Sequence, residues 1–322
     1  MRMLALAAAI SIVPSLGFAA CDQGEVRIRI AATASPQTVV RDRPARGLAD
    51  TLDRELQGSA CAELGDGDLS SLGTSAQMAL PSVSQLSERA TAWRVFDVPF
   101  AFRGVPAVER FRRAAANGDL QASASGAGAV PLGLLHAGMS HFAVRRPLVE
   151  VGELTGRKIA LDGSRYGAAF LSAAGAPPQR VPPAEWESAL ADGRLDGVSM
   201  GWQQLAGLTD KTVVTDVLAT AHRYNGYVIV AATDWWRAQP EALREQISAI
   251  VARAVTEANA FQETQLASAR RSVLRGKTTV RAPTRKQRDA WAALAEQAVA
   301  ASVSEIPIVD LASQLKAANT YP

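Results

Sequence analysis

One helix that is longer than a small domain constrains this fold most. Apolar residues recur at helical spacing from residue 241 to about residue 275, directly after Pro240. The stripe consists of Leu243, Ile247, Ile250, Val251, Ala254, Val255, Ala258 and Phe261. At 1.5 Å per residue such a helix spans roughly 50 Å. We therefore expect it to cross two lobes rather than to pack within one.

The rest of the chain alternates strand and helix patterns, which is typical of an α/β protein. Strands are expected at 25–32, 77–80, 130–135, 141–144, 158–161 and 228–232, and helices at 44–57, 105–117, 164–174, 184–191 and 284–303. The length of 322 residues suggests about two domains. No internal repeat or low-complexity linker separates them, so we expect a two-lobed fold with interwoven lobes.

The first twenty residues have the pattern of a secretory signal peptide. Met1-Arg2-Met3 is positively charged, residues 4–18 carry no charge, and small residues follow. The apolar run is shorter than the roughly 20 residues that a membrane-spanning helix needs. We expect residues 1–20 to be cleaved near Ala19 or Ala20 and the mature protein to be periplasmic. A buried N-terminal helix is the alternative.

The two cysteines, Cys21 and Cys61, suit an exported protein. In an oxidising compartment an even number of cysteines favours a disulfide. Cys21 precedes the first expected strand, and Cys61 lies where a second strand is expected to begin. Two parallel strands joined by one helix begin side by side, so these thiols can meet. Lipidation of Cys21 after signal cleavage is the alternative.

The charge pattern argues against nucleic acid as a partner. Lys and Arg number 34 against 31 acidic residues, the net charge is +3, and the two signs are interleaved. His136, His141 and His222 show no metal-ligand spacing with each other or with the cysteines. We expect no cofactor, no metal site and no enzymatic activity, and a monomeric protein.

Several short segments, taken in order, resemble one known family. Val95–Arg103 is similar to its "VFDLPFLFR", Gln77–Leu80 to "DMA", Arg146–Leu148 to "RPI", Leu154–Ile159 to "LKGLKI", Ala189–Gly197 to "ALQTGVVDG", and His222–Tyr224 to "HxY". The family is DctP, the periplasmic solute-binding proteins of TRAP (tripartite ATP-independent periplasmic) transporters. The resemblance covers most of residues 25–300.

This resemblance implies two α/β lobes with a hinge and a ligand cleft between them. One lobe would contain residues 21–140 and about 215–250, and the other residues 141–214 and about 251–322. The long helix 241–275 would cross both. The implied function is the capture of a small solute by hinge closure and its delivery to the membrane subunits of a TRAP transporter.

The chain departs from the family where the family binds its ligand. The Arg of "KIR", which pairs with a substrate carboxylate, is Ala160 here, and a second Arg, in "GxR", is Ser140. Arg165 is the only nearby arginine that could replace these two cations. The alternative is that Arg165 is simply a solvated residue of its helix. We therefore expect no simple dicarboxylate or sialic-acid-like anion held in the family manner. If Arg165 is solvated, a neutral or weakly polar solute fits better.

The family alignment, together with the rule that ligands lie at the carboxyl ends of strands, gives the candidate site. It consists of Thr33, Ser35, Ser82, Ser140, Ala160, Asp162, Arg165, Met200, Trp202, His222, Tyr224 and Asn225. Met200 and Tyr224 are the members most expected to serve packing alone. Two alternatives stay open: a degenerate binding protein that acts as a sensor input or partner scaffold, and a periplasmic enzyme. A scaffold would have a collapsed or apolar-filled cleft.

Overall fold

The computed structural model describes residues 25–32, 39–115, 118–302 and 308–320. The expected signal peptide, Cys21, Thr33 and Ser35 lie outside these residues. Everything predicted of them above therefore stays a prediction.

The described strands form one mixed sheet in the order β2-β1-β3-β7-β4-β6-β5, with β8 also paired to β7. The strands are β1 (Val26–Ala31), β2 (Ala60–Gly65), β3 (Met78–Ala79), β4 (Ala129–Val144), β5 (Ile159–Ala160), β6 (Gly197–Gly201), β7 (Asp216–Ala232) and β8 (Thr279–Arg281). As expected, β1 and β2 are parallel and are joined by one helix. Cys61 lies opposite Arg27 in this pair.

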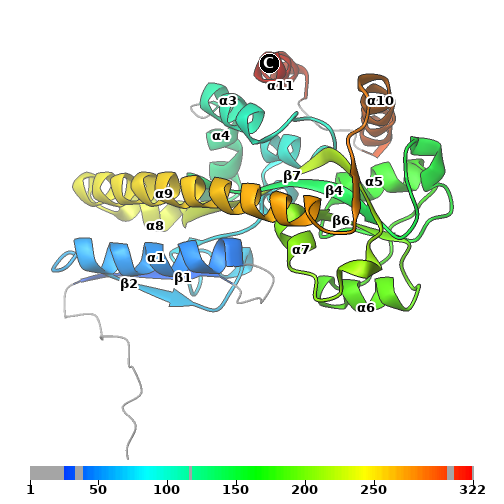
Figure 1. The fold of residues 1–322 in the computed structure, drawn as a ribbon. Coiled ribbons are helices and arrows are strands. Elements are labelled where there is room, and N and C mark those ends of the chain that lie inside the picture. The colour runs from blue at the N-terminus through cyan, green and yellow to red at the C-terminus, as the bar shows by residue number, and fades with distance from the viewer. Residues whose placement is uncertain (1–24, 33–38, 116–117, 303–307, 321–322) are drawn as a thin grey trace, which may run out of the picture.

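Two long antiparallel strands, β4 and β7, run through the whole sheet (Figure 1). At one end β7 pairs with β3, which leads on to β1 and β2. At the other end β4 pairs with β6, and β7 pairs with β8. Two groups of strands thus share only β4 and β7, which makes the lobes interwoven.

The expected strands 130–135 and 141–144 are parts of the single strand β4. The boundaries of the lobes stay a prediction. The sequence predicts that the chain returns to the first lobe near residue 215, just before β7. The first residues of β7, Asp216–Leu218, nevertheless pair with β8 and so belong with the second group of strands.

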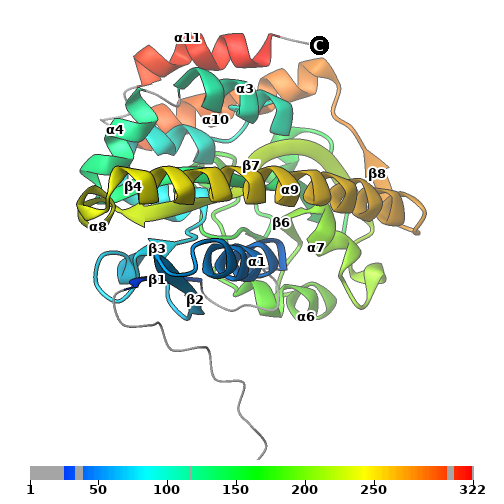
Figure 2. The same ribbon diagram turned by 90° about the vertical axis from the view of Figure 1, so that its left-hand side faces the viewer.

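Helices cover both faces of the sheet. They are α1 (Val39–Glu55), α2 (Val83–Arg89), α3 (Val105–Ala115), α4 (Asp119–Gly126), α5 (Arg165–Ala173), α6 (Trp186–Ala191), α7 (Trp202–Ala206), α8 (Thr233–Ala238), α9 (Glu241–Leu274), α10 (Arg285–Ser302) and α11 (Ile308–Asn319). In Figures 1 and 2, α3, α4, α10 and α11 lie above the central strands β4 and β7, and α6 and α7 lie below them. Helix α1 packs on β1 on the same face as α9. Within the described residues, none of these helices is long and apolar enough to span a membrane.

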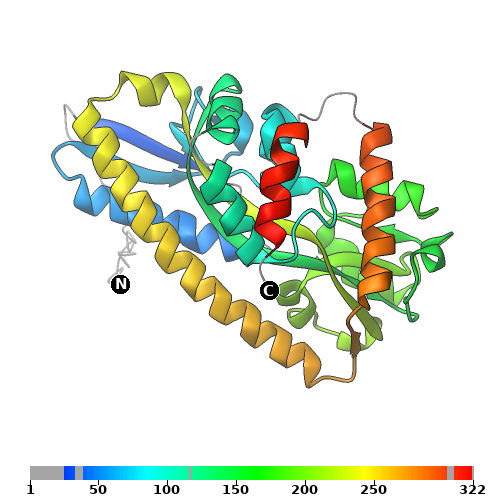
Figure 3. The ribbon, with the colours of Figure 1, turned by 90° about the horizontal axis from the view of Figure 1, so that it is seen from above.

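The long helix is confirmed as α9, which runs along the length of the molecule (Figure 3). It packs on α1 near one end and on α7 near the other, and it crosses β4 between them. Asn259 ties it to β4, since its side chain accepts from the His136 amide and donates to the Leu134 carbonyl, each at 2.9 Å. Gly138 has φ +96°, and a β-carbon there would lie 3.0 Å from Leu266 of α9. Glycine thus allows the close approach of strand and helix.

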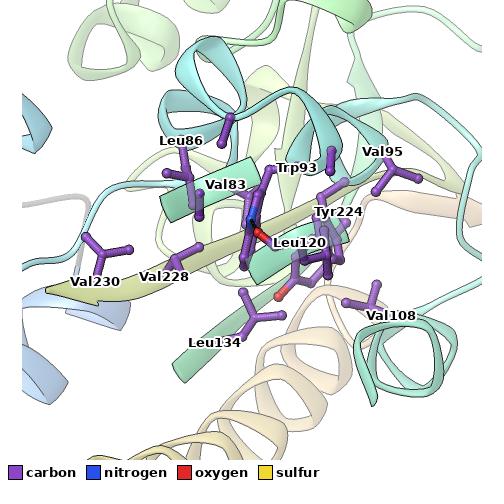
Figure 4. Packing of buried hydrophobic residues seen from close by; sticks show 14 of the residues in the cluster. Val83, Leu86, Trp93, Val95, Val108, Leu120, Leu134, Tyr224, Val228 and Val230 are labelled. Carbon is purple, nitrogen blue, oxygen red and sulfur yellow. Dashed lines mark hydrogen bonds between the residues drawn. The ribbon is translucent and has the colours of Figure 1, made fainter. Parts of the chain in front are cut away.

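The apolar and aromatic segment 93–102 is the centre of one hydrophobic core. Its first part is the 3-10 helix η2 (Thr91–Asp97), which buries Trp93 and Phe96. Figure 4 shows Trp93 among Val83 and Leu86 of α2, Leu120 of α4 and Tyr224 of β7. This core fixes η2 against the middle of β7, where the two groups of strands meet.

Candidate functional site

A bulge in β7 marks the junction of the two lobes. Ser140 pairs with Arg223, but two residues further along β4 Phe142 pairs with Leu218, so residues 219–222 bulge out of register. Ala221 within the bulge has φ +47°, and Phe100, whose amide donates to the His222 carbonyl at 2.6 Å, has φ +63°. Positive φ is uncommon outside glycine and is often retained at functional positions. Backbone strain is thus concentrated at the junction.

Asp97 connects the lobes from the end of η2. Its carboxylate is 1% exposed. It accepts from the Ser84 hydroxyl at 2.7 Å within its own lobe and from the Tyr166 amide of α5 at 3.4 Å across the junction. Burial raises the pKa of Asp97, while the charge of Arg223 and hydrogen bonds, including one from Ser164, lower it. Asp97 therefore acts as a buried polar link between the two lobes.

Arg223 is the buried cation of this junction. It is 7% exposed, and its Nε has no hydrogen-bond partner within the described residues. It lines a small cavity that is partly open to solvent and has room for about one water molecule. The other lining residues are Phe142, Leu161, Gly167, Phe170, Leu171, Ser199 and His222. Its lining is apolar with a few polar groups, but the space is far smaller than a small-molecule site.

A second small cavity, also partly open to solvent and with room for about one water molecule, lies at the N-terminus of α5. It is lined by Ser84, Ser87, Glu88, Arg94, Asp97, Gly163, Arg165 and Tyr166. The hydroxyl of Tyr166 is buried without a partner among the described residues. Because α5 residues line both cavities, the start of this helix separates them.

Ser199 and His222 form a hydrogen-bonded pair on neighbouring elements of the junction. A hydrogen bond of 2.9 Å joins Ser199 Oγ to His222 Nε2, and one of 2.7 Å joins His222 Nδ1 to Thr220. The sequence analysis missed this pair, although Gly197–Gly201 spells Gly-x-Ser-x-Gly, a pattern found around catalytic serines.

The geometry of this pair is not that of an activated nucleophile. Ser199 lies within β6, is 3% exposed and has no left-handed backbone angle, so it does not occupy a sharp strand-to-helix turn. Burial holds the pKa of His222 well below its ordinary value, and the charge of Arg223 lowers it further. Thr220 supplies no negative charge to stabilise an imidazolium. His222 is therefore a weak base.

Tyr224 belongs to a chain of hydrogen bonds beneath the junction. Its hydroxyl bonds to His136 Nδ1 at 2.7 Å, and His136 Nε2 lies 3.0 Å from Glu109 of α3. Although burial opposes ionisation, hydrogen bonds from His136 and Arg112 hold the pKa of Glu109 at about 2. Tyr224 packs on Phe96 and so joins β7 to the core around η2. It serves packing, as expected.

His141 and Trp202 meet on the other side of β4. Their rings lie 4.3 Å apart. The Ala221 amide donates to His141 Nδ1 at 3.0 Å. Burial and the charge of Arg270 lower the pKa of His141 to about 3, so the imidazole is neutral. Its Nε2 is then a buried donor with no partner among the described residues.

The structure brings together only part of the sequence-predicted set. His222 lines the cavity beside Arg223, and Asn225 donates to the Ser140 hydroxyl at 2.8 Å. Ser82 caps α2 by accepting from the Gln85 amide.

The other predicted residues lie apart from that group. Ala160 and Met200 are fully buried in an apolar cluster with Trp202, and Asp162 is exposed. Arg165 is exposed at the rim of the second cavity. Whether these residues contact a ligand stays a prediction. Asp97 and Arg223 were missed as site residues because only their burial distinguishes them.

Two interwoven α/β lobes, with buried polar groups and cavities at their junction, define a two-lobed binding protein. The chain belongs to the DctP family, described as bacterial extracellular solute-binding protein, family 7, whose model matches residues 66–305. It is 27% identical to the C4-dicarboxylate-binding periplasmic protein DctP of Vibrio cholerae over 296 residues, which is 89% of each chain.

Solved structures share the fold. A TRAP periplasmic solute-binding protein of Shewanella oneidensis with bound succinate superposes with a TM-score of 0.79 at 23% identity, over 92% of this chain and all of that one. One from Ochrobactrum anthropi, whose C-terminus is bound in its ligand-binding pocket, gives 0.81 at 19% identity, over 91% and 95% of the two chains.

Proposed function

We propose that this protein captures a small solute at the lobe junction in the periplasm and delivers it to the membrane subunits of a TRAP transporter. The family supports solute binding, and the relatives named periplasmic or TRAP proteins support the location and the transporter. The lobes close about the crossing strands β4 and β7, a hinge motion known for binding proteins of this kind.

One observation carries this proposal. Three buried polar atoms at the junction lack a hydrogen-bond partner among the described residues: His141 Nε2, the Tyr166 hydroxyl and Arg223 Nε. Such an atom costs about 1–3 kcal/mol when it stays unpaired, so buried polar groups are nearly always satisfied. Tyr166 and Arg223 each line one of the two cavities, so a polar solute that enters either cavity supplies a partner that the described residues do not.

A second candidate function is that of a scaffold or sensor input that has lost solute binding. The apolar burial of Ala160 favours it, because in the family that the sequence resembles this position carries the arginine that pairs with a substrate carboxylate. The two functions differ in one measurable respect, since a scaffold gains no stability from any small solute.

We propose no enzymatic activity. The family is one of solute-binding proteins. The Ser199–His222 pair is buried, and its histidine is too weak a base to activate the hydroxyl.

A thermal-shift screen of the mature protein against a library of small metabolites tests the proposal. A solute at 100 times its Kd stabilises the folded state by about 2.7 kcal/mol, which raises Tm by roughly 4 °C in a protein of this size. Small-angle X-ray scattering with the same solute should then show a smaller radius of gyration. A library that leaves Tm unchanged throughout contradicts solute capture and favours the scaffold.

A further inference from the structure

The interleaving of positive and negative charges breaks down between the last turns of α9 and the start of α10. Residues 264–288 contain no Asp or Glu, and their basic residues are Arg270, Arg271, Arg275, Lys277, Arg281, Arg285, Lys286 and Arg288. Arg281 pairs with Asp216, and Arg285 lies 3.9 Å from Asp289. Arg288 donates to backbone carbonyls of the junction. The basic residues at the end of α9 have no such partners.

Four exposed cations lie together at this end of α9. Arg270 and Arg271 belong to the last two turns, Arg275 is the C-cap residue, and Lys277 follows in the turn that leads to β8. None of the four has an ion pair within the described residues. Figure 3 shows this end of the helix at an outer edge of the molecule. We call Arg271, Leu274, Arg275 and Lys277 the α9 tip.

An exposed leucine stands among these cations. Leu274 is 49% exposed. The other large apolar side chain that is exposed among the described residues is Phe261, which lies under the guanidinium of Arg43 at 4.8 Å. Arg270 and Arg271 precede Leu274 by four and three residues, so they lie beside it on the helix surface. The helix dipole accounts for cations at a helix C-terminus, but it does not account for an exposed leucine between them.

The backbone of the α9 tip is fixed to the rest of the molecule. Val273, next to Leu274, is buried in one apolar cluster with Val213. The Thr278 hydroxyl donates to the Val214 carbonyl at 3.1 Å, and β8 then pairs with β7. The tip therefore presents its side chains from an ordered support, which lowers the entropy lost when a surface binds them.

We infer that the α9 tip docks on the anionic surface of a lipid bilayer, with its cations over the headgroups and Leu274 at the boundary with the acyl chains. Interfacial membrane binding combines electrostatic attraction to anionic lipid with the burial of apolar side chains. A protein partner would instead need a larger apolar centre than one leucine. This inference goes beyond the proposed function, since it concerns where the protein rests rather than what it captures.

The expected binding is weak and reversible. One Lys or Arg near an anionic surface raises the binding constant roughly fivefold, so the three cations of the α9 tip together contribute about 100-fold. Burying the exposed half of Leu274 adds about another fivefold. Because most of the binding is electrostatic, it should depend on anionic lipid and on salt.

Co-sedimentation with vesicles tests this inference. The protein is produced without residues 1–20, so that Cys21 carries no lipid. The vesicles consist of phosphatidylcholine alone or contain about one quarter anionic phosphatidylglycerol. One variant combines Arg271→Gln, Arg275→Gln and Lys277→Gln, and another is Leu274→Ser. Arg270 is left unchanged because its charge acts on His141. A control with the same change in net charge replaces three exposed, scattered residues: Arg46→Gln, Arg180→Gln and Arg237→Gln. Circular dichroism and Tm confirm that each variant is folded.

The expected result is binding of the wild type to the anionic vesicles and not to the neutral ones. The triple variant of the α9 tip should bind about 100-fold more weakly, and Leu274→Ser about fivefold more weakly. The control should stay within about threefold of the wild type. Raising NaCl from about 0.1 M to about 1 M shortens the screening length from about 10 Å to about 3 Å. This change should release the wild type from the vesicles without any substitution.

Other outcomes overturn the inference. A wild-type protein that stays in solution with the anionic vesicles, or that binds both kinds of vesicle equally, contradicts docking on anionic lipid. Equal losses in the triple variant and in the control would show that net charge, and not the α9 tip, governs binding. Binding to poly-L-glutamate but not to vesicles would point to an acidic polypeptide as the partner instead. Solute capture is measured separately by the thermal-shift screen, so a failure here leaves the proposed function standing.

Discussion

Replacing Asp97 with alanine should loosen the junction between the lobes. The Ser84 bond of 2.7 Å lies within one lobe, so its loss lowers overall stability without affecting closure. The bond from the Tyr166 amide crosses to α5 and is long, at 3.4 Å. We therefore assign the cross-lobe contacts about 1–2 kcal/mol, the lower end for hydrogen bonds to a charged group. The closed form should become about 5- to 30-fold less populated relative to the open form.

Small-angle X-ray scattering of the protein partly saturated with the stabilising solute measures this shift as a larger radius of gyration. The matched control is Asp192→Ala, since that carboxylate is exposed and bonds to Arg194 two residues along the chain. Asp192→Ala should leave the scattering profile unchanged. An Asp97→Ala profile identical to that of the wild type would refute the role of Asp97 as a link between the lobes.

The pH dependence of stability gives an independent check on Asp97. Because burial raises its pKa above the ordinary value of 3.8, the native state holds this proton more tightly than the unfolded state does. The contribution of Asp97 to stability therefore falls as pH rises from that ordinary value through the raised one. Urea denaturation across this range should show the fall in the wild type and not in Asp97→Ala.

Three further predictions follow from other parts of the chain. Intact-mass measurement of periplasmic protein with and without reductant should show a Cys21–Cys61 disulfide, which closes a loop of about 40 residues and contributes about 3–4 kcal/mol; two free thiols or a lipid adduct on Cys21 would contradict it. Glu109 is partly buried, but hydrogen bonds, chiefly the one from His136, hold its pKa at about 2. The free energy of unfolding should therefore drop by about 1–2 kcal/mol, after allowance for solvent screening, as pH falls from 4.5 towards 2. Glu109→Gln should remove that drop. Ala221→Gly should raise the free energy of unfolding by about 0.5–1 kcal/mol, because glycine adopts the positive φ without strain; a decrease would show that the bulge is not strained.

The sequence alone predicts the elements whose signal is local. The apolar stripe of α9 repeats over many turns, so its length and its span of both lobes are foreseeable. The continuity of β4 is not. Gly138 and the polar residues around it interrupt the apolar pattern between the two expected strands. The strand continues there because β7 and α9 hold it from either side.

The candidate site depends on contacts between distant segments and is therefore only partly predictable. His222 and Ser140 follow from the family pattern. Arg223 stands in the variable position of "HxY", and nothing local shows that the bulge at 219–222 and the pairing with Ser140 bury it. Ser199 stands in a Gly-x-Ser-x-Gly pattern, but the sequence does not show that the fold of β6 brings it within 2.9 Å of His222.

A crystal structure with the solute that raises Tm most tests the central claim, that the lobe junction is the binding site. We predict that the solute lies at the lobe junction, between α5 and β7. Within hydrogen-bond distance of Arg223 Nε, the solute would supply the partner that the described residues lack. A solute bound outside the junction, or one that leaves Arg223 without a partner, would contradict this account.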